Sequence, residues 1–245
     1  MIALNLPARS TLSALLVSIL CLGLGACKEK PEQQAVRQVY EAYSTAMESM
    51  DGPTVSKHSS DSTLKYYERL LKTGLTAPAQ QVWGLPPVEM REVLMMRNRA
   101  TRSQLRGHTG KGYLIYATNQ GWGLGGGDDT EWKFTEIKVT GDKATAKMVE
   151  VIPMSVRNLA VLSRRARVRE AARRERQRQA RSYTLSFVLE ESVWKFDETT
   201  LHPRFNNELS LAAKQFRVPM REILMDLESD ESGKDGTMKT WDPMK

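Results

Sequence analysis

The spacing of apolar residues changes near Gly112, and this change restricts the fold more than any other feature of the chain. Before Gly112, apolar residues recur every three or four positions, which is the period of an amphipathic helix. After it, apolar and polar residues alternate and β-branched and aromatic residues become more frequent, which is typical of strands. Because the helices come first, we expect an α+β fold with N-terminal helices packed on an antiparallel sheet.

Three amphipathic helices are expected before the change of period. Each begins at a capping residue or a proline, and the first two end at a glycine-containing segment. The segment 75–106 contains three prolines, and its pattern leaves open whether it is all helix or partly a lid. The first helix should run from Pro31 to Asp51-Gly52-Pro53, and the second from the capping residues Ser60, Asp61 and Ser62 to Gly74. The third should start at Pro86-Pro87.

Five strands are expected after Gly112, with tight turns at Gly141-Asp142 and at Glu191-Ser192. The alternation slips after Phe134 and again at Met148-Val149, which predicts bulges and therefore a curved sheet. Two short helices should follow the sheet, and the polar residues 229–245 should be disordered. The expected elements are strands at Tyr113–Ala117, Trp132–Val139, Lys143–Val151, Tyr183–Glu190 and Val193–Thr199, and helices at Leu209–Phe216 and Met220–Leu227.

The N-terminal residues 1–26 have the pattern of a secretion signal, in which Arg9 precedes an apolar run that is too short to span a bilayer comfortably. The run ends in Leu24-Gly25-Ala26-Cys27, which resembles the lipobox of bacterial lipoproteins. The resemblance implies cleavage before Cys27, acylation of this residue and a short tether over residues 27–31. It implies a place in the cell envelope on the periplasmic side, and Lys28 in the position of a retention aspartate favours the outer membrane.

The cysteine count agrees with this processing. Cys21 would leave with the signal, and Cys27 would be blocked as a thioether. The remaining chain would then have no thiol for a disulfide, a nucleophile or a metal site. We expect residues 32–228 to form a single domain.

Two short motifs carry a second resemblance. Ile137–Ala146 and Ser192–Asp197 resemble the strand pair "hydrophobic-V-x-G-D-x-A" and the later "W-K-hydrophobic-D" of lipoprotein members of the nuclear-transport-factor-like superfamily. The resemblance implies a cone-like α+β fold in which a curved sheet wraps a long helix, as in SnoaL-like proteins and ketosteroid isomerases. The superfamily contains enzymes, binders and adaptors, so the resemblance does not assign a reaction.

Motifs for cofactors and metals are weak in this chain. Gly121–Gly126 matches a dinucleotide fingerprint by letter, but an acidic segment and a strand follow it instead of a helix. Gly107–Gly112 echoes a phosphate-binding loop without its spacing. The histidines, His58, His108 and His202, are far apart, so we predict no metal site and no cofactor. Several tyrosines are possible donors to a catalytic carboxylate, but the spacing selects no carboxylate: Tyr40, Tyr43, Tyr66, Tyr67, Tyr113 and Tyr116.

The segment 163–181, between the third and fourth expected strands, carries all the excess charge of the chain. It holds nine arginines and two glutamates, a net charge of +7 that equals the charge of the whole chain. We expect a helical insertion that is either simply solvated or an anion-binding arm, with arginine favouring phosphate or carboxylate contacts. The candidate anion-binding residues are Arg164, Arg165, Arg167, Arg169, Arg173, Arg174, Arg176, Arg178 and Arg181.

These observations favour a non-catalytic, lipid-anchored envelope protein that binds a partner protein or a small apolar ligand, and not a nucleic acid. One alternative is a SnoaL-like isomerase, dehydratase or hydrolase acting on a hydrophobic substrate. The other is an assembly factor that contacts anionic lipid or an acidic protein through the arginine segment. An enzyme would need a water-excluding pocket with a carboxylate or histidine of shifted pKa, whereas an assembly factor needs no pocket.

Overall fold

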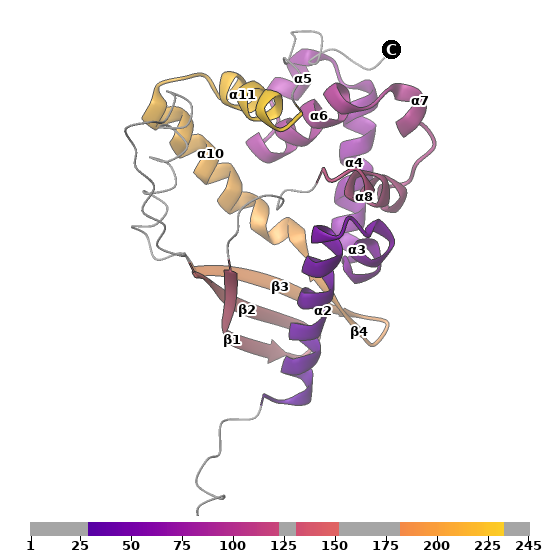
Figure 1. Ribbon diagram of the computed structural model, residues 1–245, viewed down its shortest axis with the longest axis vertical. Coiled ribbons are helices and arrows are strands. Elements are labelled where there is room, and N and C mark those ends of the chain that lie inside the picture. Colours follow the sequence, from indigo (N-terminus) through magenta and orange to yellow (C-terminus); the bar gives the residue numbers. More distant parts are fainter. Residues whose placement is uncertain (1–28, 123–130, 152–181, 233–245) are drawn as a thin grey trace, which may run out of the picture.

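The computed structural model describes residues 29–122, 131–151 and 182–232 (Figure 1). The fold is α+β, with one four-stranded antiparallel sheet in the order β1-β2-β3-β4. Figure 1 shows the sheet and α2 in the lower half of the molecule, and α4 to α8, α10 and α11 gathered in the upper half. The expected class and the antiparallel sheet are confirmed. The strands are β1 (Glu131–Thr140), β2 (Lys143–Val151), β3 (Ser182–Glu190) and β4 (Val193–Asp197).

The first expected helices are confirmed, with one addition between them. Helix α2 (Pro31–Glu48) begins at Pro31, and α4 (Asp61–Thr76) begins after Ser60, whose hydroxyl accepts from the amide of Thr63 at 3.2 Å. Between them, Asp51 caps a short helix α3 (Gly52–His58), which the apolar pattern did not predict. Gly74 does not end the second helix, because it lies inside α4 and packs against Met96.

The segment that the pattern left open is helical. It forms α5 (Ala79–Trp83), α6 (Pro87–Arg99) and α7 (Arg102–Leu105). The strand expected at Tyr113–Ala117 is wrong, since these residues lie in α8 (Gly110–Asn119). Thr109 starts α8 by accepting from the amide of Gly112, and the buried Tyr113, Leu114 and Ala117 have helical spacing as well as a partly alternating one.

The sheet follows the expected register, with a bulge where the alternation slips. The β1–β2 register shifts between Phe134 and Glu136, which leaves Thr135 as the extra residue. The second expected slip, at Met148-Val149, is wrong, because β2 pairs with β3 without interruption. Both turns are as expected, with positive φ at Gly141 and at Glu191-Ser192.

The last elements are a 3-10 turn η2 (Glu198–Leu201), α10 (His202–Phe216) and α11 (Met220–Ser232). Both C-terminal helices were expected, but α10 begins at His202 instead of Leu209. The expected disorder is wrong for residues 229–232, which complete α11. The rest of the expected tail lies outside the described residues. In the parts of the chain that the structure describes, no helix is both long enough and apolar enough to cross a bilayer.

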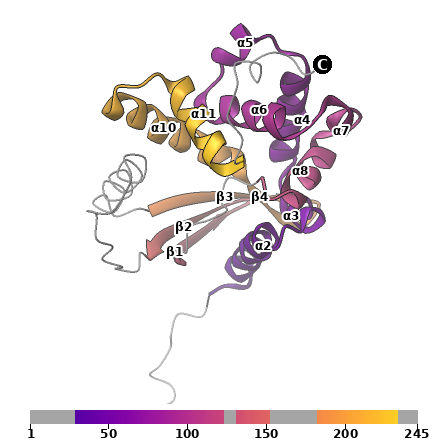
Figure 2. The ribbon, with the colours of Figure 1, turned by 45° about the horizontal axis from the view of Figure 1, so that its top comes forward.

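The space between α2 and the sheet is filled by aromatic side chains. The ring of Tyr40 lies 5.5 Å from Phe134, 6.5 Å from Phe187 and 5.5 Å from Phe196, each time edge to face. Tyr43 also contacts Phe196, with ring centroids 4.9 Å apart. Figure 1 shows α2 crossing the strands near one end of the sheet, and Figure 2 shows the helix on one side of these strands. The interface between α2 and the sheet is therefore part of the packed core.

Candidate functional site

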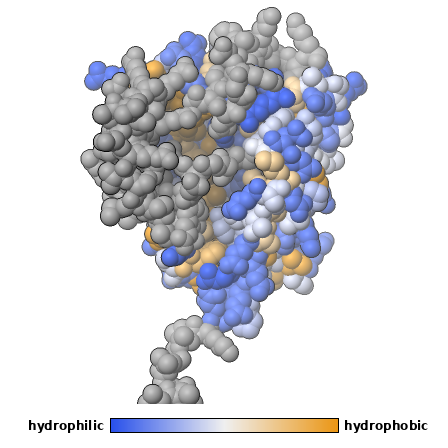
Figure 3. All heavy atoms as spheres, in the orientation of Figure 1, coloured by the Kyte–Doolittle hydropathy of each residue, from blue (hydrophilic) through white to orange (hydrophobic). Residues whose placement is uncertain are grey.

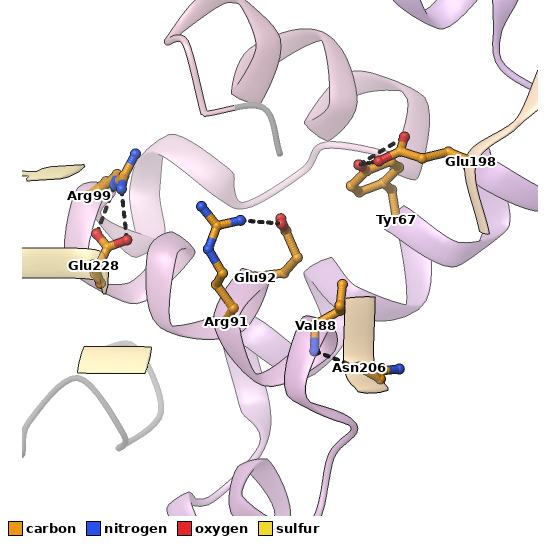
Figure 4. A network of polar contacts seen from close by, with 8 residues as sticks. All are labelled: Tyr67, Val88, Arg91, Glu92, Arg99, Glu198, Asn206 and Glu228. Carbon is orange, nitrogen blue, oxygen red and sulfur yellow. Dashed lines mark hydrogen bonds and ion pairs between the residues drawn. The ribbon is translucent and has the colours of Figure 1, made fainter. Parts of the chain in front are cut away.

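A buried carboxylate lies where the sheet meets the helices. Glu198 is the first residue of η2, directly after β4, and it is 7% exposed. Its carboxylate accepts hydrogen bonds from the hydroxyl of Tyr43 at 3.0 Å and from that of Tyr67 at 3.1 Å (Figure 4 draws the Tyr67 contact). Its backbone amide donates to the hydroxyl of Thr63 at 3.1 Å. One acidic residue thus joins α2, α4 and the end of the sheet.

The electrostatics of this cluster follow from its burial. Burial raises the pKa of the Glu198 carboxyl above its ordinary value of 4.5, and the two tyrosine donors oppose this shift only in part. Burial, together with the charge of Glu198, raises the pKa of Tyr43 and of Tyr67 well above 10. Both phenols therefore stay protonated and act as donors, and the carboxyl keeps its proton to a higher pH than an exposed glutamate does.

A second group of buried polar side chains lies next to this carboxylate. Tyr66 stacks on His202 with ring centroids 4.3 Å apart, and Tyr67 lies 5.9 Å from Tyr113. The hydroxyls of Tyr66 and Tyr113 and the Nε2 atom of His202 are buried without a hydrogen-bond partner among the described residues. Burial lowers the pKa of His202 below 6.5, so its ring is neutral at pH 7.

Further polar contacts tie α6 to the C-terminal helices (Figure 4). The guanidinium of Arg99 donates to both carboxylate oxygens of Glu228 in α11, each at 2.7 Å. Asn206 in α10 accepts from the amide of Val88 at 2.8 Å. Glu92, which is also buried, lies 3.9 Å from the guanidinium of Arg91. The first two contacts connect different helices, whereas Arg91 and Glu92 both lie in α6.

Two hollows in the described surface lie away from the buried carboxylate. One, of about 460 Å³, is lined by polar and small residues of α2 together with Asp51 and Thr54. The other, of about 270 Å³, lies between α4 and the start of α8. Neither is lined by Glu198, Tyr43 or Tyr67. Small molecules that enter these hollows do not meet the carboxylate.

The structure brings few of the expected functional residues together. Cys27 and the nine arginines of residues 163–181 lie outside the described residues, as does most of Gly121–Gly126. In the segment 107–112, which partly matches a phosphate-binding loop, Thr109 caps α8. The backbone amide of Gly110, the first residue of α8, donates to the carboxylate of Glu68. The described residues contain no group of histidines, cysteines and acids able to hold a metal ion.

Apolar periodicity does not reveal the buried carboxylate, although one feature of the sequence points to it. Tyr43 and Tyr67 were among the possible donors, but no acid was selected for them. In the strand pattern, Glu198 continues the phase of Trp194 and Phe196, both of which point into the core. An acidic residue at a core-facing position at the end of a strand is therefore the sequence feature that indicates a buried carboxylate.

Comparison of the chain with protein-family models, with curated proteins and with solved structures gives no match. The resemblances to lipoproteins and to the nuclear-transport-factor-like superfamily therefore rest on the quoted motifs alone.

Proposed function

We propose that this chain is a lipid-anchored protein of the cell envelope that acts as a non-catalytic binding or scaffold module. The observation that carries the non-catalytic part is the packed space between α2 and the sheet, where Tyr40 contacts three phenylalanines. In a cone-like fold this is the space in which a substrate would lie. The anchor is supported by the lipobox pattern that ends at Cys27.

The anchor is tested by metabolic labelling with a palmitate analogue and by membrane fractionation. The full chain should incorporate the label and sediment with the envelope, mainly in the outer-membrane fraction. Cys27→Ala should abolish incorporation of the label. Cys21→Ala is the matched control, because it removes a cysteine from the apolar run and leaves the lipobox intact. Equal labelling of the Cys27→Ala chain would contradict the anchor.

An enzyme of the SnoaL-like type is a second candidate, and one observation favours it. A carboxyl with a raised pKa and two phenol donors, such as Glu198 with Tyr43 and Tyr67, is a donor set that suits proton abstraction or oxyanion stabilisation. The two candidates differ in the effect of Glu198→Gln. An amide oxygen in the place of Oε2 can still accept from both tyrosines, which lie 3.0 and 3.3 Å from that atom, but the amide has no titrating proton. A binding module should therefore retain its cellular role and an enzyme should lose it.

The arginine segment belongs to the proposal as a second contact with the envelope. Its net charge of +7 would attract anionic head groups, by about 1 kcal/mol per basic residue near the surface. Changing Arg164, Arg165, Arg173 and Arg174 to Gln should weaken the binding of the non-acylated chain to anionic vesicles at low salt. Unchanged binding would contradict the arm and leave the acyl anchor unaffected.

A further inference from the structure

The face of β1 and β2 that points away from the core carries a set of lysines. Ile137, Ala144 and Ala146 are buried, so the residues that alternate with them point outward. Lys138, Lys143 and Lys147 occupy such positions and are exposed, as is Lys133 nearer the start of β1. We call Lys138, Lys143 and Lys147 the lysine face.

The register of the two strands brings these lysines together. Lys147 lies opposite Glu136, Lys138 opposite Thr145, and Lys143 opposite Thr140. Adjacent strands are about 4.8 Å apart, so the side chains of the lysine face share one small area. Glu136 pairs with Lys138 at 3.0 Å. Because one glutamate stands against the three lysines, these outward positions of β1 and β2 keep a net positive charge.

The start of α2 places this face close to the proposed anchor. The side-chain amide of Gln33 donates to the carbonyl of Ile137 at 2.6 Å, so the first turn of α2 contacts β1, which is the first strand in the order of the described sheet. Figures 1 and 2 both show the N-terminal end of α2 beside β1, and Figure 3 shows hydrophilic residues gathered at this end. Pro31, the first residue of α2, is four positions after Cys27, and four residues can span at most about 14 Å.

This maximum reach is less than twice the screening length at physiological salt, about 8 Å, so the proposed tether keeps the start of α2 near the surface charge of the membrane. We propose that the lysine face binds the anionic phospholipid head groups of the membrane that holds Cys27. The inference rests on the proposed acyl anchor. Lipid fits this face better than a protein partner does, because the exposed outward positions 136, 138, 140, 143, 145 and 147 carry only charged and polar side chains, and protein interfaces have an apolar centre.

The test uses the acylated full chain in vesicles of phosphatidylcholine, either alone or with one third phosphatidylglycerol. Lysine acetylation, measured by mass spectrometry, reports the exposure of each ammonium group. Lys138, Lys143 and Lys147 should react on the order of fivefold more slowly in the anionic vesicles, the factor expected for one basic residue at such a surface. Lys65, Lys72 and Lys111 on α4 and α8 are internal controls and should react equally in both.

A charge variant makes the test independent of the tether. In Lys143→Gln/Lys147→Gln, the remaining Lys138 should lose its protection by phosphatidylglycerol, whereas Lys65→Gln/Lys72→Gln should leave that protection intact. An acylated chain whose lysine face reacts equally in both vesicles, or whose Lys138 stays protected in the variant, overturns this inference alone. A chain without acyl groups overturns the anchor, and the inference falls with it.

Discussion

Removing the carboxylate of Glu198 is the sharpest test of the buried cluster. In Glu198→Ala, the hydroxyls of Tyr43 and Tyr67 lose their acceptor while remaining fully buried. An unsatisfied buried donor costs about 1–3 kcal/mol, so the two together should lower the free energy of unfolding by about 2–6 kcal/mol. This is a large part of the total stability of a domain, which is about 5–15 kcal/mol.

The isosteric change gives a different expectation. In Glu198→Gln, the side-chain oxygen still accepts from the tyrosines and the charge is gone, so stability at pH 7 should be equal to that of the wild type or higher. Because burial raises the pKa of Glu198 above 4.5, the folded state holds a proton that the unfolded state has lost. The wild type therefore loses stability as the pH rises through the folded pKa, and the glutamine variant lacks this loss.

The assay is urea unfolding followed by circular dichroism at several values between pH 5 and pH 8. Glu136→Ala is the control, since it removes an exposed carboxylate with a surface ion pair worth at most about 1 kcal/mol. If Glu198→Ala costs no more than this control, the carboxylate does not hold the two phenols. If Glu198→Gln and wild type have parallel pH profiles, the raised pKa is wrong.

Three other predictions follow from local geometry. Burial lowers the pKa of His202, so the wild type should lose stability as the pH falls below 6.5. His202→Phe keeps a ring against Tyr66, and its melting temperature should depend less on pH in that range. An unchanged dependence on pH would contradict the burial of the His202 ring. Gly110→Ala would place a methyl group 2.2 Å from the carbonyl oxygen of Leu64 and should lower the melting temperature strongly. Gly112→Ala in the same helix is the control and should leave the melting temperature unchanged. Equal effects of the two variants would contradict the close contact of α4 and α8. In Arg99→Met, the Glu228 carboxylate loses a bidentate partner, and unfolding should become easier by about 3–5 kcal/mol in a urea titration; a loss below 1 kcal/mol would contradict this tie.

The sequence predicts the elements whose pattern is unambiguous. The helix over Val36, Val39 and Tyr43, the hairpin at Gly141 and the bulge after Phe134 all follow from period and turn chemistry. Residues 113–117 fail because Tyr113, Leu114 and Ala117 satisfy both periods over a short span. In that case the cap at Thr109 and the packing on α4 decide the structure, and only the second is invisible in the sequence.

The buried cluster could be predicted only in part, for a related reason. Tyr43, Tyr67 and Glu198 come from three elements that are separated by 24 and 131 positions in the chain. Apolar periodicity places the two tyrosines on core-facing stripes, but it does not say which polar atom each hydroxyl reaches. Their shared acceptor is fixed by the angle at which α2 and α4 meet the end of β4, which is a property of the packed structure.

The position of Tyr43 connects the cluster to the proposed anchoring. Helix α2, which would follow the proposed tether, contacts β1 through Gln33, the sheet aromatics through Tyr40 and the carboxylate through Tyr43. Three different kinds of contact along one helix fix its direction relative to the sheet. If Cys27 is acylated as proposed, these contacts would also fix the orientation of the domain at the membrane, because Glu29 pairs with Arg37 and Lys30 caps α2 directly after the proposed anchor. Under the proposed anchor, this fixed packing of α2 would present the same face to the head groups at all times and so increase the effective concentration of the lysine face at the surface.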